Sequence, residues 1–312
     1  MTGTRETAPE ATMPADAAGR GPLTLIRGVV RATRPRQWVK NVLVVAAPFA
    51  ANRIDDREVL RDTALSFLAF CLVAAAVYLV NDAIDVAADR AHPTKRNRPI
   101  AAGVVPIPVA YAVAVLLFLG SVAVSLLAGW PLLIVIVVYA AAQLGYCLGL
   151  KHQPVIDLCI VASGFLLRAI AGGAAAGLPL SEWFLLVTAF GSLFMVSGKR
   201  YAEIIYFERT GARIRESLTK YSASYLRFVW ATSAAIMITT YALWAFEIRV
   251  GHHPVWSAVS IIPFVVAVLR YAVDVDGGTA GEPEEIALKD RVLQVLGLAW
   301  VASLALAVYL PH

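Results

Sequence analysis

The sequence has little of what a secreted or soluble protein of its length would need. Only three of its 312 residues are cysteine, and charged residues make up 16% of the chain. All three cysteines lie inside apolar segments, so they predict small core residues and no disulfide framework. Residues 1–22 contain no apolar run of the kind that a signal peptide requires. We expect them to form a disordered tail.

Hydrophobic residues are abundant instead and make up 59% of the chain. Apolar segments of about 20 residues recur along it, which is typical of a polytopic membrane protein. We therefore predict an all-α protein with nine transmembrane helices, forming one domain over residues 23–312 in the lipid bilayer. The nine segments lie at about 38–52, 62–81, 105–128, 131–150, 154–176, 183–199, 224–247, 255–272 and 291–310.

Lysine and arginine are distributed unevenly between the two sides that these helices define. If the N-terminus is cytoplasmic, 22 of the 27 Lys and Arg residues fall in cytoplasmic segments and four in outer ones. Cytoplasmic loops of membrane proteins carry such an excess. We therefore expect a multi-pass protein of the inner (cell) membrane, with the N-terminus and the active site in the cytoplasm and the C-terminus outside.

An acidic stretch, NDAIDVAAD at residues 81–89, follows the second apolar segment. On a continuous helix its polar residues fall within about 100° of one face, with Tyr78 among them. Carboxylates so close repel each other, and Mg²⁺ carrying a phosphate or diphosphate would relieve the repulsion. The alternative is an ordinary solvated helix end. We predict four metal ligands, of which the three acids are also catalytic: Asn81, Asp82, Asp85 and Asp89.

Basic residues gather at three places on the same predicted side of the membrane. Some follow the acidic stretch, others lie at the start of the first apolar segment, and a third group ends the sixth. They are suited to phosphate oxygens, although interfacial anchoring and the general cytoplasmic excess of positive charge are alternatives. The substrate-binding residues that we predict, with Asn81 and Tyr78, are Lys40, Lys95, Arg98, Lys199, Arg200 and Glu203.

One further charged residue, Arg168, lies deep in the fifth apolar segment, where a charge is costly and must face a partner or a cavity. Asp157 lies 11 residues earlier, which returns to nearly the same helical face. Two interpretations follow. Arg168 forms a structural ion pair with Asp157, or it supports the wall of a substrate cavity, and we count it among the predicted substrate-binding residues.

The pattern Asn-Asp-x-x-Asp-x-x-x-Asp at the end of the second of nine helices resembles the UbiA-like intramembrane prenyltransferase superfamily. Three stretches are more specifically similar to the actinobacterial decaprenyl-phosphate phosphoribosyltransferases: 34–41 (RPRQWVKN), 81–103 and 197–203 (SGKRYAE). The last departs from the superfamily, whose usual second acidic motif is replaced here by a mostly basic one. This departure favours substrates with several phosphate groups.

The resemblance implies a UbiA-like fold and a transferase that uses Mg²⁺. Its substrates would be phosphoribosyl diphosphate (PRPP) and a polyprenyl phosphate, and its product would feed arabinan synthesis in the cell wall. The alternatives are transfer of a prenyl group from a prenyl diphosphate to an aromatic acceptor, and a transporter or membrane scaffold. We expect no nucleic-acid partner, and a homo-oligomer remains open.

Overall fold

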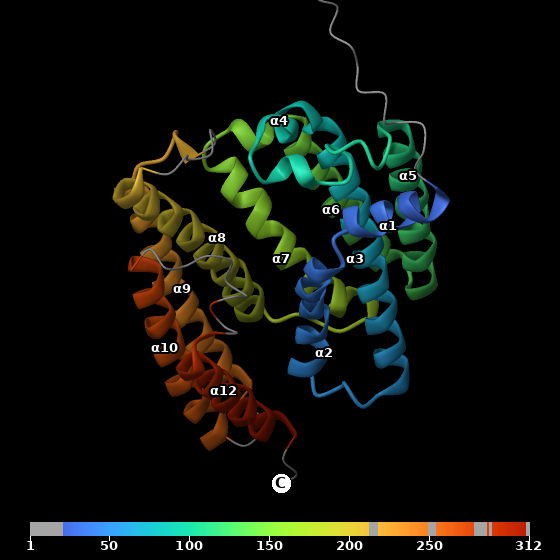
Figure 1. The fold of residues 1–312 in the computed structure, drawn as a ribbon. Coiled ribbons are helices and arrows are strands. Elements are labelled where there is room, and N and C mark those ends of the chain that lie inside the picture. Colours follow the sequence, from blue (N-terminus) through green and yellow to red (C-terminus); the bar gives the residue numbers. More distant parts are fainter. Residues whose placement is uncertain (1–20, 212–217, 249–253, 278–285, 287–288, 310–312) are drawn as a thin grey trace, which may run out of the picture.

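The computed structural model describes residues 21–211, 218–248, 254–277, 286 and 289–309. The described residues form helices joined by turns and loops (Figure 1), and none of them lies in a β-strand by its backbone hydrogen bonds. Of the expected tail at residues 1–22, residues 1–20 lie outside the described part of the chain, and Pro22 already begins the first helix. In chain order the helices are α1 (Pro22–Ala32), η1 (Pro35–Val45), α2 (Ala46–Ala50), α3 (Arg57–Ile84), α4 (Val86–Ala91), η2 (Lys95–Asn97), α5 (Ile107–Ala128), α6 (Trp130–Leu148), η3 (Leu150–His152), α7 (Ile156–Ala175), α8 (Glu182–Thr210), α9 (Ala223–Ile248), α10 (Pro254–Asp276) and α12 (Arg291–Tyr309).

Seven of the described helices, and not the expected nine, are long and apolar enough to cross a membrane: α3, α5, α6, α7, α9, α10 and α12. The prediction of nine is therefore wrong. The segment expected at 38–52 divides into the 3₁₀-helix η1 and the five-residue helix α2. The segment expected at 183–199 lies in α8, which is 29 residues long but carries charged side chains at its start and in its second half.

Helix α3 is the central element, because it packs against α5, α6, α7 and η1. Its N-terminus is capped by Asp56, whose Oδ1 accepts the backbone N–H groups of Glu58 and Val59 at 2.9 and 3.4 Å. The hydrogen bond from Arg53 holds the pKa of Asp56 below its usual value. The apolar body of α3 then runs to Ile84, which places the acidic stretch at its other end.

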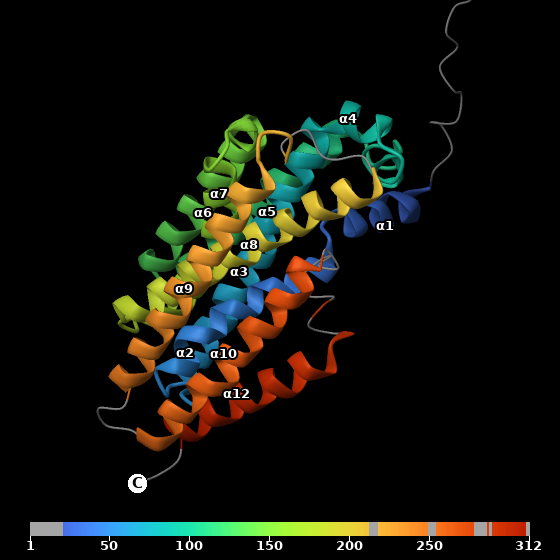
Figure 2. The same ribbon diagram turned by 90° about the vertical axis from the view of Figure 1, so that its left-hand side faces the viewer.

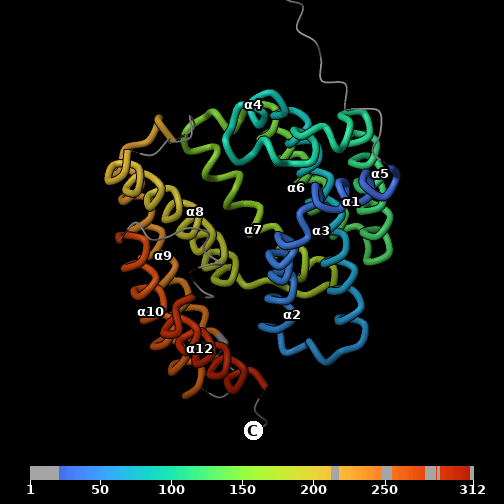
Figure 3. The backbone as a smooth tube through the Cα atoms, in the orientation of Figure 1, coloured from blue at the N-terminus to red at the C-terminus, as the bar shows by residue number. Residues whose placement is uncertain are grey.

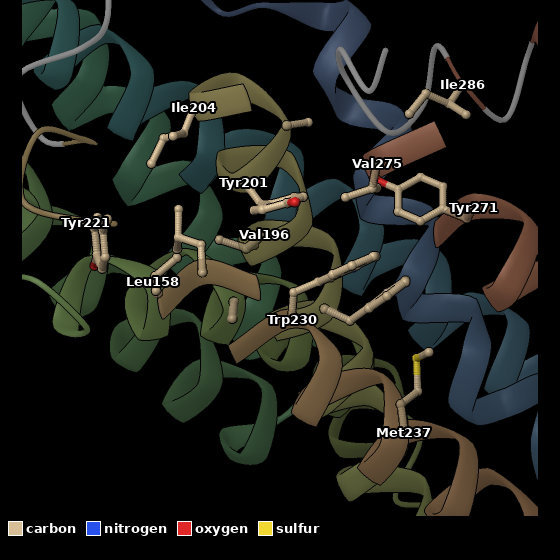
Figure 4. Close-up of a cluster of buried hydrophobic side chains, with 14 of the residues drawn as sticks. Leu158, Val196, Tyr201, Ile204, Tyr221, Trp230, Met237, Tyr271, Val275 and Ile286 are labelled. Atoms are coloured by element: carbon tan, nitrogen blue, oxygen red, sulfur yellow. The ribbon is translucent and has the colours of Figure 1, made fainter. Parts of the chain in front are cut away.

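A second group of helices, α8, α9, α10 and α12, packs beside α7 (Figures 2 and 3). Aromatic rings fill the core between α8, α9 and α10 (Figure 4). Trp230 of α9 lies between Phe194 and Tyr201 of α8, with ring centroids 5.9 and 5.8 Å away and nearly parallel planes. Stacked rings of this kind add to the energy of area burial and hold α9 against α8.

The polar ends of several helices meet at one end of the molecule. Figures 1 and 2 show α4, the start of α7 and the start of α9 there. Contacts support this arrangement, because Lys220 donates to the carbonyl of His152 and the backbone N–H of Val155 donates to the hydroxyl of Tyr221. The acidic stretch and the beginning of α7 therefore face the same side of the bundle.

Candidate functional site

The acidic stretch does not form one continuous helix. Helix α3 ends at Ile84, Asp85 is its C-cap with φ −84° and ψ 7°, and α4 begins at Val86. The acidic face expected from helical spacing is divided into two pairs that face different neighbours. Asp82 and Asp89 face the segments around Arg34 and Arg98, whereas Asn81 and Asp85 face α6 and η3.

The first pair is buried and held by two arginines. Asp82 and Asp89 are each 2% exposed. Arg98 Nη1 lies between them, 3.1 Å from Asp82 Oδ1 and 2.7 Å from Asp89 Oδ2. Arg34 Nη2 approaches the same Asp82 oxygen at 2.5 Å. Buried carboxylates require such partners because an unpaired charge in the interior is costly.

Arg34 reaches Asp82 through an unusual backbone conformation. It has φ 52° and ψ 61°, the left-handed region, which costs a residue with a Cβ about 1–2 kcal/mol. The turn ends α1 and starts η1, and it places the Arg34 guanidinium over the ring of Tyr78, 4.7 Å from the centroid. Strain of this kind persists where surrounding contacts over-determine it, and it is common at functional sites.

The second pair faces α6 and η3. Lys151 Nζ lies 2.6 Å from Asp85 Oδ1, and the thiol of Cys147 donates to Asn81 Oδ1 over 3.5 Å. Asp85 and Lys151 are both half-buried. The predicted phosphate ligand Lys95 lies in η2, in the loop that carries Arg98.

Arg168 does not pair with Asp157. Its guanidinium donates to Asn41 Oδ1 (2.7 Å), the Gly164 carbonyl (2.6 Å) and the Tyr139 hydroxyl (3.1 Å), and it is 6% exposed. It also lies 5.8 Å from the ring of Phe165. Among the described residues, no carboxylate forms an ion pair with it, so it is a buried positive charge supported by neutral acceptors.

The same ring of Phe165 lies 6.0 Å from the predicted phosphate ligand Lys40 of η1. Asn41 links η1 to its neighbours, because its amide also donates to Cys71 Sγ of α3 over 3.2 Å. Lys40 and Arg168 therefore bring two positive charges to the same aromatic ring.

Asp157 binds Arg200 of α8 instead, and it accepts a hydrogen bond from the hydroxyl of Tyr221. The Asp157 carboxylate is 1% exposed. Burial raises the pKa of Tyr221, and the neighbouring Asp157 raises it further. Lys199 and Glu203 lie beside Arg200 on α8 and are half-buried. The structure thus joins the α8 cluster to the start of α7.

Sequence reasoning missed three participants. Arg34 lies in a stretch identified as basic, but its positive φ has no sequence signal such as glycine or asparagine. Lys151 is a single lysine between two apolar segments, 66 residues from Asp85. Tyr221 precedes α9 and carries no motif. Only tertiary packing identifies these three residues.

The donor atoms at the acidic stretch suit a divalent cation. Carboxylate and amide oxygens are the ligands that Mg²⁺ takes, with one or two carboxylates and the phosphates of a substrate completing its sphere. Within the described ranges no three His, Cys, Asp or Glu side chains gather as a ready metal site. A cationic nitrogen of Arg98 nevertheless bridges two carboxylates, so the charge of this pair fits a bridging cation.

These features, an all-helical membrane bundle with acids and cations at one end, define an intramembrane transferase of the UbiA type. The chain matches the model of the UbiA prenyltransferase family over residues 42–289, and it belongs to that family. A solved UbiA homolog from Archaeoglobus fulgidus bound to DMAPP and Mg²⁺ shares the fold with a TM-score of 0.69. The match covers 90% of this chain and 97% of that one, at 16% identity.

More similar relatives are named decaprenyl-phosphate phosphoribosyltransferase. That of Mycobacterium tuberculosis is 60% identical over 300 residues, which cover 95% of this chain and 99% of the relative. That of Corynebacterium glutamicum is 56% identical over 297 residues, covering 93% and 89%. The resemblance inferred from the three sequence stretches is thereby confirmed.

Proposed function

We propose that the protein transfers 5-phosphoribose from PRPP to decaprenyl phosphate or a similar polyprenyl phosphate and releases pyrophosphate. The relatives named for this activity share most of the chain. The observation that carries the proposal is the alternation of acids and cations at the α3–α4 junction, where Asp82, Asp85 and Asp89 meet Arg34, Arg98 and Lys151. Such a site suits a metal-bound diphosphate that carries further phosphate groups.

Asn81, Asp82, Asp85 and Asp89 would hold Mg²⁺, which would neutralise the donor's diphosphate and stabilise the leaving pyrophosphate. When that cation takes the carboxylates, Arg34, Arg98 and Lys151 become available to phosphate oxygens. Arginine and lysine bind such oxygens well, arginine often with two parallel hydrogen bonds. The same side chains therefore balance the acids without substrate and bind the substrate when it is present.

In the proposed transfer, an oxygen of the polyprenyl phosphate attacks C1 of the ribose on the face opposite the diphosphate. A new C1–O bond forms as the old one breaks, and the bonding electrons leave with pyrophosphate. The attacking oxygen is already anionic at neutral pH, so no general base is required. Lys40, Lys199 and Arg200 would bind and orient the phosphates, and Arg168 would support the cavity wall.

The distribution of Lys and Arg supports a cytoplasmic site. The acidic stretch lies at the end of the bundle where Arg34, Arg98, Lys151 and Arg200 gather, and the cytoplasmic ends of membrane proteins carry an excess of Lys and Arg. PRPP is a soluble, strongly anionic molecule that would enter from the cytoplasm, whereas the polyprenyl tail would remain in lipid. The product would supply arabinan synthesis for the cell wall.

An assay with purified protein tests the proposal. Labelled PRPP, polyprenyl phosphate and Mg²⁺ should place label in the lipid phase, and Asp85→Asn should abolish the transfer. The matched control is Asp62→Asn, a carboxylate of the same helix at its other end, paired with Arg61 at 2.8 Å. Transfer from a prenyl diphosphate to an aromatic acceptor, with no lipid-phase label from PRPP, would overturn the proposal.

A further inference from the structure

A small polar cavity of about 150 Å³ lies beside the acidic pair. It lies where three segments meet: the end of α1, the end of α3 and the loop around η2. This volume is smaller than the roughly 300–1,000 Å³ typical of sites that enclose a whole small molecule. It suits one polar group of a larger substrate. Its polar lining consists of Arg31, Arg34, Asp82, Thr94, Asn97 and Arg98.

The charge of the lining indicates which group fits. Three arginines and one aspartate line the cavity, so the lining carries an excess of positive charge. A phosphate monoester carries about −1.5 to −2 at neutral pH. Each arginine has five N–H donors, and Arg34 and Arg98 each use one guanidinium nitrogen in their ion pairs with the acids. The hydroxyl of Thr94 and the amide of Asn97 add neutral donors.

We propose that this cavity is a subsite for a terminal phosphate monoester. It shares Asp82 with the acidic pair, so a substrate whose diphosphate lies at that pair can reach it with a second anionic group. The inference rests on the proposed function for its two sources, the 5-phosphate of PRPP and the phosphate of the polyprenyl acceptor. It extends the predicted phosphate ligands to α1, which sequence reasoning did not include.

Arg31 provides the cleanest test. It is exposed at the end of α1, and its side chain forms no ion pair with a described acid, so Arg31→Gln should leave the acidic pair intact. The control is Arg27→Gln, an exposed arginine one turn earlier on α1 that does not line the cavity. It reports the general effect of removing one positive charge from this helix.

Binding of ribose 5-phosphate and of farnesyl phosphate to the purified full chain should be measured by calorimetry, with ribose and farnesol as controls. Arg31→Gln should weaken binding of one phosphate probe about tenfold or more, because a hydrogen bond to a charged group is lost. Arg27→Gln should bind like the wild type. Failure of the wild type to bind either probe, or equal binding by Arg31→Gln, would overturn the subsite.

Kinetics separate the two sources. A raised KM for PRPP in Arg31→Gln assigns the cavity to the 5-phosphate, and a raised KM for polyprenyl phosphate assigns it to the acceptor. Arg31-dependent probe binding without any transfer by the wild type would refute the proposed function and leave the subsite standing. Transfer by the wild type, with both KM values and both binding constants unchanged in Arg31→Gln, would refute the subsite and leave the proposed function standing.

Discussion

Helix α7 approaches η1 so closely at Gly172 that no side chain fits between them. A Cβ added there would lie 1.8 Å from the carbonyl oxygen of Val44 and 2.7 Å from its carbonyl carbon. A carbon and a carbonyl oxygen in contact lie about 3.3–3.6 Å apart. Gly172→Ala would therefore force the two backbones apart by roughly 1.5 Å, since the obstacle is backbone and cannot rotate away.

The displacement would act on both stability and transfer. Overpacking of a core costs about 1–3 kcal/mol, against a gain of about 0.5–1 kcal/mol for alanine over glycine within a helix. We expect a net loss of about 1–2 kcal/mol from these two terms. A displacement of about 1 Å at a catalytic site can reduce the rate about 100-fold. Because η1 carries Lys40 and begins next to Arg34, we expect a similar loss of transfer.

Initial rates of transfer and thermal unfolding in detergent test this expectation. The matched control is Gly120→Ala in α5, where the added Cβ would lie 3.7 Å from Leu72 Cδ1, an ordinary contact. The control should retain the wild-type rate. If Gly172→Ala also unfolds and transfers like the wild type, the reasoning that α7 fixes the position of η1 is wrong.

Three further variants or treatments test the remaining contacts. Arg34→Gly and Arg34→Ala should lose transfer equally, but the alanine variant should unfold at a lower temperature than the glycine variant, because alanine keeps the cost of positive φ and glycine does not; equal unfolding temperatures of the two variants would contradict this. Tyr221→Phe should lower the free energy of unfolding by about 1–3 kcal/mol, since the N–H of Val155 and the carboxylate of Asp157 lose a buried partner; chemical denaturation measures it. Chelation by EDTA should abolish transfer, and Mg²⁺ should restore it; full activity in EDTA would refute the metal role.

The apolar runs were sufficient to predict the long helices, because a membrane span must satisfy its backbone hydrogen bonds internally. They were not sufficient for the first segment. Residues 35–45 adopt an unusually long 3₁₀-helix, and its Asn41 is bonded to Cys71 and Arg168, which are 30 and 127 residues away. Hydropathy carries no information on such distant partners.

For the candidate site, helical spacing predicted one shared acidic face, and the structure arranges these residues differently. Helical spacing placed the acids of residues 81–89 together, but α3 ends at Ile84 and the acids face two different sets of neighbours. Spacing also suggested a pair between Asp157 and Arg168. In the structure, Arg168 donates to neutral acceptors and Asp157 pairs with Arg200. Only tertiary contacts determine these partners.

The ion pairs at the α3–α4 junction also bear on substrate choice. Buried acids need a positive partner whether or not substrate is bound, and Arg34 and Arg98 fill that need for Asp82 and Asp89. A metal-bound diphosphate can replace them only if the displaced arginines find new anions. A prenyl diphosphate has a single anionic group, the diphosphate, which would bind at the acids. PRPP and polyprenyl phosphate together carry two phosphate monoesters in addition to a diphosphate. On the proposed function, the arginines therefore disfavour the usual prenyl donor of the family and favour substrates with additional phosphates.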